Sequence, residues 1–224
     1  MCGRYAIYGP VSRASRDAIE FLGEEIAFHP TFNAAPTRNL PVFRVNPERG
    51  RTLTLLRWGL VPSWAKDPAI GARMINARSE TVAEKPAFRT AFRRRRCLVP
   101  MSGFYEWQKA GGRKVPHFVR LLNKDVFAAA GLYEYWPGKD GAAPIESYTI
   151  LTTGPNELMR AVHDRMPVIL HERDYEAWLD PRNEKLEALS GLLTPFPAEE
   201  MRAYPISARV NNTRNDGPEL IEPA

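Results

Sequence analysis

A cysteine stands directly after the initiator methionine, in the opening sequence MCGRY. Removal of Met1 would leave Cys2 with a free α-amine beside its thiol, whereas an internal cysteine has only an amide nitrogen, which is not nucleophilic. The amine has a reference pKa of roughly 7.7–8.0 and the thiol one of roughly 8.5, so both nucleophiles exist in part near neutral pH. An aldehyde can condense with the amine, and the thiol can then close a five-membered thiazolidine ring. The alternative is that Cys2 is only a small buried residue.

Two proton carriers stand later in the chain, Glu106 in GFYEW and His163 in HDRMP. Strand alternation puts Phe104 and Glu106 on one face and Tyr105 and Trp107 on the other. A carboxyl group beside apolar side chains has a raised pKa and can act as a general acid, and histidine carries protons near pH 7. The alternatives are an exposed edge-strand glutamate and a histidine that caps the preceding helix.

Several arginines are suited to phosphate groups, because a guanidinium binds phosphate through paired hydrogen bonds. Arg4 stands beside the cysteine, and Arg78 and Arg165 stand in the sequences NARSET and HDRMP. The run Arg93–Arg96 also permits a DNA contact, although four arginines at a helix end equally complement the helix dipole and solvate the surface. For each single arginine, the alternative is a solvated surface charge.

Composition limits the class of protein. The chain has 224 residues, a formal net charge of +5, 44% hydrophobic and 25% charged residues, which is ordinary for a globular protein and permits a polyanionic partner. Two cysteines, Cys2 and Cys97, exclude a disulfide framework, and the four histidines have no chelating spacing, so we expect no metal and no cofactor. Cys97 precedes an apolar strand, which predicts a buried, inert thiol.

Without a secretory signal or an apolar stretch of about 20 residues, a cytoplasmic protein is expected, associated with the nucleoid when engaged on DNA.

The elements that must position these residues are short. Turn sequences separate apolar segments that predict an antiparallel meander, preceded by a hairpin around NPERG. The sequence predicts an α+β protein with one domain over residues 1–224, built on a curved, mainly antiparallel sheet or barrel-like core with peripheral helices. The predicted strands are 5–8, 40–45, 51–60, 97–100, 104–108, 117–122, 126–136 and 147–153. The predicted helices are 13–22, 155–162, 172–179 and 184–193. A further short helix is predicted to start at Pro86 and run into Arg93–Arg96.

Eight motifs in order resemble those of the SOS-response-associated peptidase family, the abasic-site processing proteins. They are MCGRY, NAAP, WGLVPSWAKD, NARSET, RRCLVPMSGFYEW, AGLYEYW, TTGPNELMRAVHDRMPVIL and NDGPELIEP. The resemblance implies removal of Met1 by the protein's own peptidase activity, followed by a thiazolidine link between Cys2 and the ring-opened abasic deoxyribose. The crosslink would shield the lesion from strand cleavage, and family members can reverse it or show lyase behaviour. The implied partner is single-stranded DNA containing abasic sites, bound by a monomer with no membrane association, and the replication partner stays open.

The resemblance also implies roles for single residues. The catalytic group comprises Cys2, Asn76, Glu106 and His163, with Asn76 orienting the cysteine amine through its side-chain oxygen. Trp64 and Pro36 would form an apolar wedge against unstacked bases, where stacking is worth roughly 1–3 kcal/mol per base. Core packing is the alternative for both. The DNA-binding group comprises Arg4, Asn33, Pro36, Trp64, Arg78 and Arg165.

Three other functions remain open at this point. N-terminal-nucleophile amidohydrolases of the glutamine amidotransferase kind also begin with Met-Cys-Gly, although NARSET and GFYEW do not fit them. A non-catalytic nucleic-acid-binding module would explain the basic charge without requiring Cys2. A peptidase acting on other proteins lacks a second recognisable nucleophile in this sequence.

Overall fold

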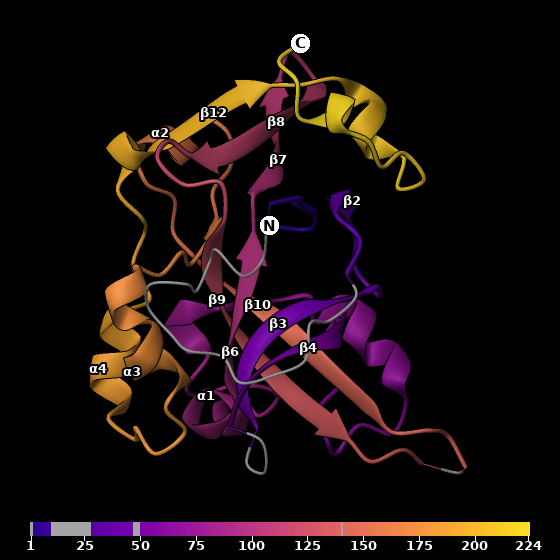
Figure 1. Ribbon diagram of the computed structural model, residues 1–224, viewed down its shortest axis with the longest axis vertical. Helices are drawn as coiled ribbons and strands as arrows, with labels where there is room; N and C mark the ends of the chain where they lie inside the picture. The colour runs from indigo at the N-terminus through magenta and orange to yellow at the C-terminus, as the bar shows by residue number, and fades with distance from the viewer. Residues whose placement is uncertain (1, 10–27, 47–49, 140) are drawn as a thin grey trace.

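The computed structural model describes residues 2–9, 28–46, 50–139 and 141–224, and strands dominate it (Figure 1). The helix predicted over 13–22 lies outside the described residues. The strands are β1 (Tyr5–Ile7), β2 (Thr31–Ala34), β3 (Asn39–Asn46), β4 (Gly50–Trp58), β5 (Asn76–Arg78), β6 (Arg96–Met101), β7 (Gly103–Ala110), β8 (Arg113–Leu121), β9 (Phe127–Trp136), β10 (Ile145–Thr153), β11 (Met166–Pro167) and β12 (Met201–Pro205). The helices are α1 (Arg89–Arg94), α2 (Glu157–Arg160), α3 (Tyr175–Leu179) and α4 (Leu186–Gly191).

Five strands close into a barrel. β4 pairs with β3, β3 with β6, and β6 with β9, all antiparallel, while β10 pairs antiparallel with β9 and parallel with β4. The parallel contact closes the ring where Ser147 lies opposite Arg57 and Tyr148 opposite Trp58. The predicted hairpin and the predicted α+β class with a barrel-like core are confirmed, but the sequence did not predict the parallel pairing.

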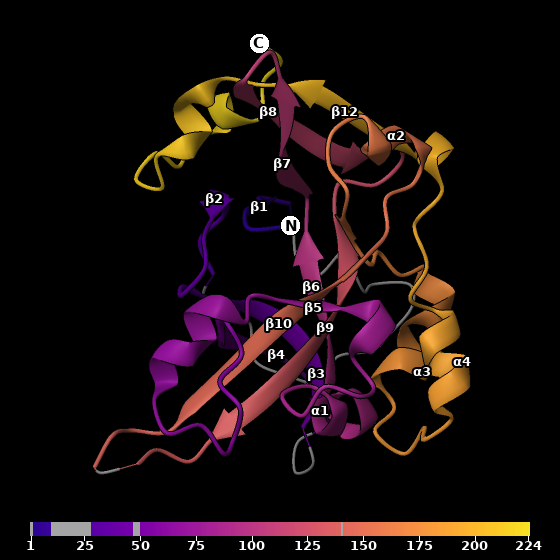
Figure 2. The same cartoon turned by 180° about the vertical axis from the view of Figure 1, so that it is seen from behind.

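Five other strands form a second sheet in the order β12-β8-β7-β1-β2, which stands at one end of the barrel (Figures 1 and 2). Its centre is the β7–β8 hairpin, with Lys109 opposite Lys114 next to the turn. On the other side of β7, Tyr5 of β1 lies opposite Phe104. The start of the chain therefore pairs with the strand that carries Glu106.

The chain passes from the barrel to this sheet between β6 and β7, so the prediction of a simple meander over 97–153 is wrong. Ser102 Oγ accepts hydrogen bonds from the backbone N–H groups of Tyr8 (3.2 Å) and Gly9 (3.3 Å) and so fixes the crossing point. At Gly103, a Cβ would lie 2.2 Å from Cζ of Phe118, so no larger residue fits between the two strands. These tertiary contacts, which hydrophobic alternation does not record, send β7 out of the barrel.

Most buried apolar side chains belong to two clusters. One cluster lies between the second sheet and the barrel interior and includes Cys2, Phe104 and Trp58. The other covers the outer face of the barrel beneath α1, α3 and α4, with Phe92 and Trp178 among its largest side chains. The helices are thus peripheral, and each is shorter than its predicted range because the flanking residues form turns and 3₁₀ segments.

The arginine run Arg93–Arg96 divides into three environments. Arg93 and Arg94 are exposed at the end of α1, and Arg95 pairs with Glu134 at 2.7 Å. Arg96 is 2% exposed and donates to backbone carbonyl oxygens of Phe92, Arg93, Trp178, Asp180 and Asn183. A buried guanidinium with its donors satisfied fixes the α1 and α3 ends to the barrel, so Arg96 contacts no DNA in this arrangement.

None of the helices in the described part of the chain is long and apolar enough to cross a membrane.

Candidate active site

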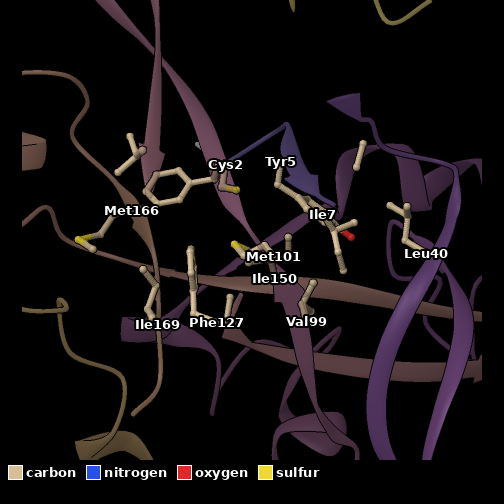
Figure 3. Packing of buried hydrophobic residues seen from close by; sticks show 14 of the residues in the cluster. Cys2, Tyr5, Ile7, Leu40, Val99, Met101, Phe127, Ile150, Met166 and Ile169 are labelled. Atoms are coloured by element: carbon tan, nitrogen blue, oxygen red, sulfur yellow. The ribbon is translucent and has the colours of Figure 1, made fainter. Parts of the chain in front are cut away.

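Cys2 lies at the edge of the main core cluster. It is fully buried, and Figure 3 shows its side chain among apolar neighbours that include Met101 and Met166. Burial raises the pKa of the Cys2 thiol, and the nearby Glu106 carboxylate raises it further. Burial therefore favours the neutral form of the thiol, and a titratable carboxyl group lies near enough to act on it electrostatically.

Asn76 holds the cysteine backbone. Its strand, β5, runs parallel to β10 with Asn76 opposite Ile150, and its side-chain Nδ2 donates to the carbonyl oxygen of Cys2 at 2.8 Å. The other side-chain atom, Oδ1, is buried and has no hydrogen-bond partner among the described residues. A buried acceptor of this kind favours a nearby donor. The nitrogen of Cys2 is a candidate for this donor, because it belongs to the same residue as the carbonyl group that Asn76 binds.

Glu106 approaches the cysteine from β7. Tyr105 donates its backbone N–H to the Arg4 carbonyl oxygen at 3.0 Å, so the antiparallel register continued by one pair brings Glu106 level with the segment Cys2–Gly3. Glu106 is 2% exposed, and β7 lies between β1 and β8, which excludes the exposed edge-strand alternative. Burial raises the pKa of Glu106 to about 7. The carboxyl group therefore exchanges a proton near neutral pH, as a general acid must.

The alternation predicted for this strand is confirmed. Phe104 packs in the same cluster as Cys2, whereas Tyr105 and Trp107 pack on the other face of the sheet with Phe118.

His163 lies on the far side of the Glu106 carboxyl group, with Nε2 3.7 Å from Oε2. Two groups compete for the other ring nitrogen: the Arg165 backbone N–H, at 3.0 Å, needs an unprotonated Nδ1, and Oδ1 of Asp164, at 2.9 Å, favours a protonated one. Burial lowers the pKa of His163, which favours the neutral ring, with Nδ1 accepting from Arg165 and the proton on Nε2 toward Glu106. The hydrogen bond from the Arg165 backbone N–H thus favours the His163 tautomer that is protonated at Nε2.

Three contacts fix the segment that carries His163. Gln108, two residues beyond Glu106 on the same strand, donates to the Ala161 carbonyl oxygen at 2.8 Å. Arg165 donates to both carboxylate oxygens of Glu80, at 2.6 and 2.9 Å, and to the Thr152 carbonyl oxygen at 2.6 Å. The distance between His163 and Glu106 is therefore set from both ends of a short segment.

These contacts bear on the prediction for Arg165 and add residues that the sequence did not single out. Arg165 was predicted to bind phosphate, but in the structure its guanidinium is largely enclosed, with side-chain exposure of 15%, and engaged by Glu80. Glu80, Thr152 and Gln108 were not predicted as site residues. Glu80 belongs to NARSET, and Gln108 shares the Glu106 side of β7 by period-two spacing, so both had a weak signal in the sequence.

Arg4 and Asn33 form a second unit beside the cysteine. Arg4 Nη1 donates to Asn33 Oδ1 at 2.7 Å and to the Val210 carbonyl oxygen at 3.0 Å. Asn33 is fully buried, and its Nδ2 donates to the carbonyl oxygens of Val210, Asn212 and Asn215. With both ends of its amide group satisfied inside the protein, Asn33 positions Arg4 and the chain near its C-terminal end, and its side chain does not face solvent.

The other predicted DNA-binding residues lie at the surface. Trp64 is 59% exposed beside the buried Ala65, whose carbonyl oxygen accepts from Trp136 Nε1 at 2.9 Å, so core packing is excluded for Trp64. Pro36 is half-buried in the turn after β2, and Arg78 is exposed at the end of β5. The geometry thus brings Cys2, Asn76, Glu106 and His163 together and leaves Trp64, Pro36 and Arg78 at the surface.

Among the described residues, no group of three or more histidine, cysteine, aspartate or glutamate side chains is arranged to hold a metal ion. The second cysteine, Cys97, is fully buried as predicted, and burial raises the pKa of its thiol.

Comparison with known proteins identifies relatives across nearly the whole chain. The chain is 44% identical over 229 residues to the abasic site processing protein YoqW of Bacillus subtilis, covering 99% of both. It is 30% identical over 232 residues to the abasic site processing protein HMCES of Xenopus tropicalis, covering 89% of this chain and 68% of the relative. A crystal structure of a protein from Bacteroides thetaiotaomicron superimposes with a TM-score of 0.87 at 28% identity, covering 100% of both chains.

The family model described as SOS response associated peptidase (SRAP) matches residues 1–213. This match spans β1 to the segment that follows β12 and includes every residue of the candidate site. The chain therefore belongs to the SOS response associated peptidase family.

Proposed function

We propose that this protein captures abasic sites in single-stranded DNA as a covalent thiazolidine at Cys2. Its relatives are abasic site processing proteins, which supports a role in handling abasic-site DNA damage. The observation that carries the chemical proposal is the grouping around Cys2: Asn76 binds its backbone carbonyl, Glu106 acts on its thiol electrostatically, and His163 lies 3.7 Å from Glu106.

The first step is hydrolysis of the bond between Met1 and Cys2. Water supplies the hydroxyl group to the methionine carboxyl and a proton to the cysteine nitrogen, which becomes a free α-amine. In our proposal the protein's own site performs this cleavage, with Glu106 and His163 as the proton-transfer groups. Asn76 Oδ1, which has no hydrogen-bond partner among the described residues, then accepts a hydrogen bond from the released amine.

The second step is condensation with the ring-opened sugar. The α-amine attacks the aldehyde carbon C1′, and the resulting carbinolamine loses water to give an imine. The Cys2 sulfur then adds to the same carbon, its proton passes to the nitrogen, and the ring closes with the overall loss of one water. Glu106, with a pKa of about 7, supplies the proton that the departing water takes.

Burial raises the pKa of the Cys2 thiol, and we propose that this shift orders the two reactions. A buried, neutral thiol is a weak nucleophile, whereas a terminal amine with a reference pKa of roughly 7.7–8.0 is partly unprotonated at neutral pH. The amine therefore reacts first, and the thiol reacts only after the more electrophilic imine has formed. Running the same steps backward releases the DNA. Loss of the C2′ proton from the imine, with departure of the 3′ phosphate from C3′, would give lyase cleavage of the strand.

The DNA contacts divide by their surroundings. We assign phosphate binding to Arg78 and Arg4 and base stacking to Trp64 with Pro36. Arg165, held by Glu80, positions the His163 segment and reaches a phosphate only if the glutamate exchanges. The proposed partner is single-stranded DNA, bound by one copy of the protein.

The family membership disfavours the glutamine amidotransferase alternative, which shares only the Met-Cys-Gly start. Denaturing electrophoresis after mixing with an abasic single strand tests the proposal. A band that survives heat and detergent is expected from the wild type and from Cys97→Ala, but not from Cys2→Ala. A heat-stable adduct from Cys2→Ala would overturn the mechanism, and glutaminase activity without any adduct would favour the amidohydrolase.

A further inference from the structure

Two open hollows meet at His163. The first, of about 430 Å³, lies between the β7–β8 hairpin and Asn211, and Glu106 and His163 form part of its lining. The second, of about 650 Å³, lies between Trp107 and the end of α2. Trp107, Lys109 and His163 line both, so the two hollows form one groove that leads away from the candidate active site. We call this the hairpin groove.

The hairpin groove is basic. Lys109 and Lys114 line its hairpin wall and Arg160 its α2 wall, and all three side chains are exposed. None of the three forms an ion pair with another residue in the described part of the chain. Apart from buried Glu106, one carboxylate lines the groove, that of Asp164, which is 87% exposed beside His163.

The two lysines are held side by side by the sheet. Lys109 lies directly opposite Lys114 in the antiparallel register of β7 and β8, so their side chains leave the same face of the hairpin. Like charges in directly opposed positions destabilise a strand pair, and this pair has no described counter-charge. An anionic occupant of the groove would remove that repulsion.

The groove also offers an aromatic wall. Trp107 is half-buried, and its indole Nε1 donates to Asn211 Oδ1 at 2.8 Å, which fixes the orientation of the ring. A fixed aromatic ring beside cations is the combination that single-stranded nucleic acids recognise, because the backbone contacts the charges while a base stacks.

We propose that the hairpin groove holds the DNA strand on one side of the abasic sugar. The first phosphates beyond the lesion contact Lys109, Lys114 and Arg160, and the neighbouring base lies against Trp107. This inference rests on the proposed function and specifies the path of its substrate. The strand on the other side of the lesion leaves past Arg78 and Trp64.

Reversible binding gives the first test. In a Cys2→Ala background, fluorescence anisotropy measures the affinity for a single strand with a central tetrahydrofuran residue, which has no aldehyde, across a range of salt concentrations. Lys109→Gln with Lys114→Gln should flatten the slope of log affinity against log salt by about 1.4, since each single-strand phosphate contact contributes about 0.7. The matched control, Lys139→Gln with Lys185→Gln, removes the same charge from exposed positions outside the groove and should leave the slope unchanged. Equal slopes for all proteins, or equal flattening in both double variants, would overturn the proposal.

Crosslinking with Cys2 intact gives the second test. Three oligonucleotides carry the abasic site at the 5′ end, the centre or the 3′ end. The Lys109→Gln and Lys114→Gln pair should slow adduct formation at subsaturating protein on the central substrate and on only one terminal substrate. On the other terminal substrate the rate should match the wild type, which shows that the chemistry at Cys2 is intact. Equal slowing on all three substrates, or none on any, would refute the strand path, whereas no adduct from the wild type on any substrate would refute the proposed function itself.

Discussion

Replacing Glu106 with glutamine keeps the size of the side chain and removes its titration. In the folded protein burial raises the pKa of this carboxyl group to about 7, against an ordinary value of 4.5. One pKa unit corresponds to about 1.36 kcal/mol, so the difference between folded and unfolded chains corresponds to about 3 kcal/mol.

The sign follows from which state binds the proton more tightly. Because the pKa is higher in the folded protein, the stability linked to protonated Glu106 is fully present below pH 4.5. It is lost progressively as the pH rises toward 7 and levels off above pH 8. The glutamine variant has no such loss, so its unfolding free energy should gain about 3 kcal/mol on that of the wild type between pH 4.5 and pH 8.

Urea unfolding at pH 4.5, 6, 7 and 8 measures this difference. Glu134→Gln provides a comparison, since it removes a second buried carboxylate, one that is paired with Arg95. That variant should lose stability at pH 8, because it leaves a cation without its partner. A constant difference between the wild type and Glu106→Gln across the range would show that Glu106 is not protonated by burial.

The same titration should appear in the chemistry. Protonated Glu106 is present below pH 7 and disappears above it, so the single-turnover rate of adduct formation should fall on the alkaline side of about pH 7. Glu106→Gln should lose that limb and react roughly 10²–10⁴-fold more slowly, the usual contribution of a general acid. An unchanged rate and profile would return Glu106 to a structural role.

Three further substitutions separate positioning, stability and chemistry. Gln108→Ala removes the hydrogen bond to Ala161 and should cost about 1 kcal/mol in thermal unfolding, while slowing adduct formation several-fold through His163; a normal rate and pH profile would show that the segment needs no such support. Arg96→Met removes five hydrogen bonds to backbone carbonyl oxygens, two of them buried, and should cost more than about 3 kcal/mol by urea unfolding, and a loss below about 1 kcal/mol would contradict this. Cys97→Ala should cost about 1 kcal/mol through its small cavity and leave the crosslinking rate unchanged, and a large loss of rate in a folded protein would show that the wrong thiol was chosen.

Local patterns in the sequence were sufficient for part of the structure. The turn NPERG between two alternating segments predicted the β3–β4 hairpin, and period-two alternation predicted the face of β7 that carries Glu106. Both depend only on neighbouring residues, so the sequence contains them directly.

Contacts between distant segments could not be predicted in this way. β5 is three residues long and too short for a periodic signal, yet its parallel pairing with β10 brings Asn76 to Cys2. Nothing near Arg165 indicates that Glu80, 85 residues earlier, binds its guanidinium. The predicted site residues were identified from family motifs, whereas Gln108 and Glu80 emerged only when the folded contacts were known.

Because burial raises the pKa of the Cys2 thiol, we propose that the α-amine of Cys2 is the first group to react with the aldehyde. If the amine reacts first, then any group that converts it to an amide must prevent ring formation even though the thiol remains. Blocking the amine therefore tests the mechanism more directly than removing the side chain.

Mass spectrometry of the crosslinked product, with and without an uncleavable N-terminal extension, makes this measurement. The untagged protein should lose Met1 and give an adduct equal to protein plus DNA less one water, while the extended protein gives none. If a protein with a verified, intact extension still forms that adduct at the native rate, the α-amine of Cys2 is not used and the proposed mechanism is wrong.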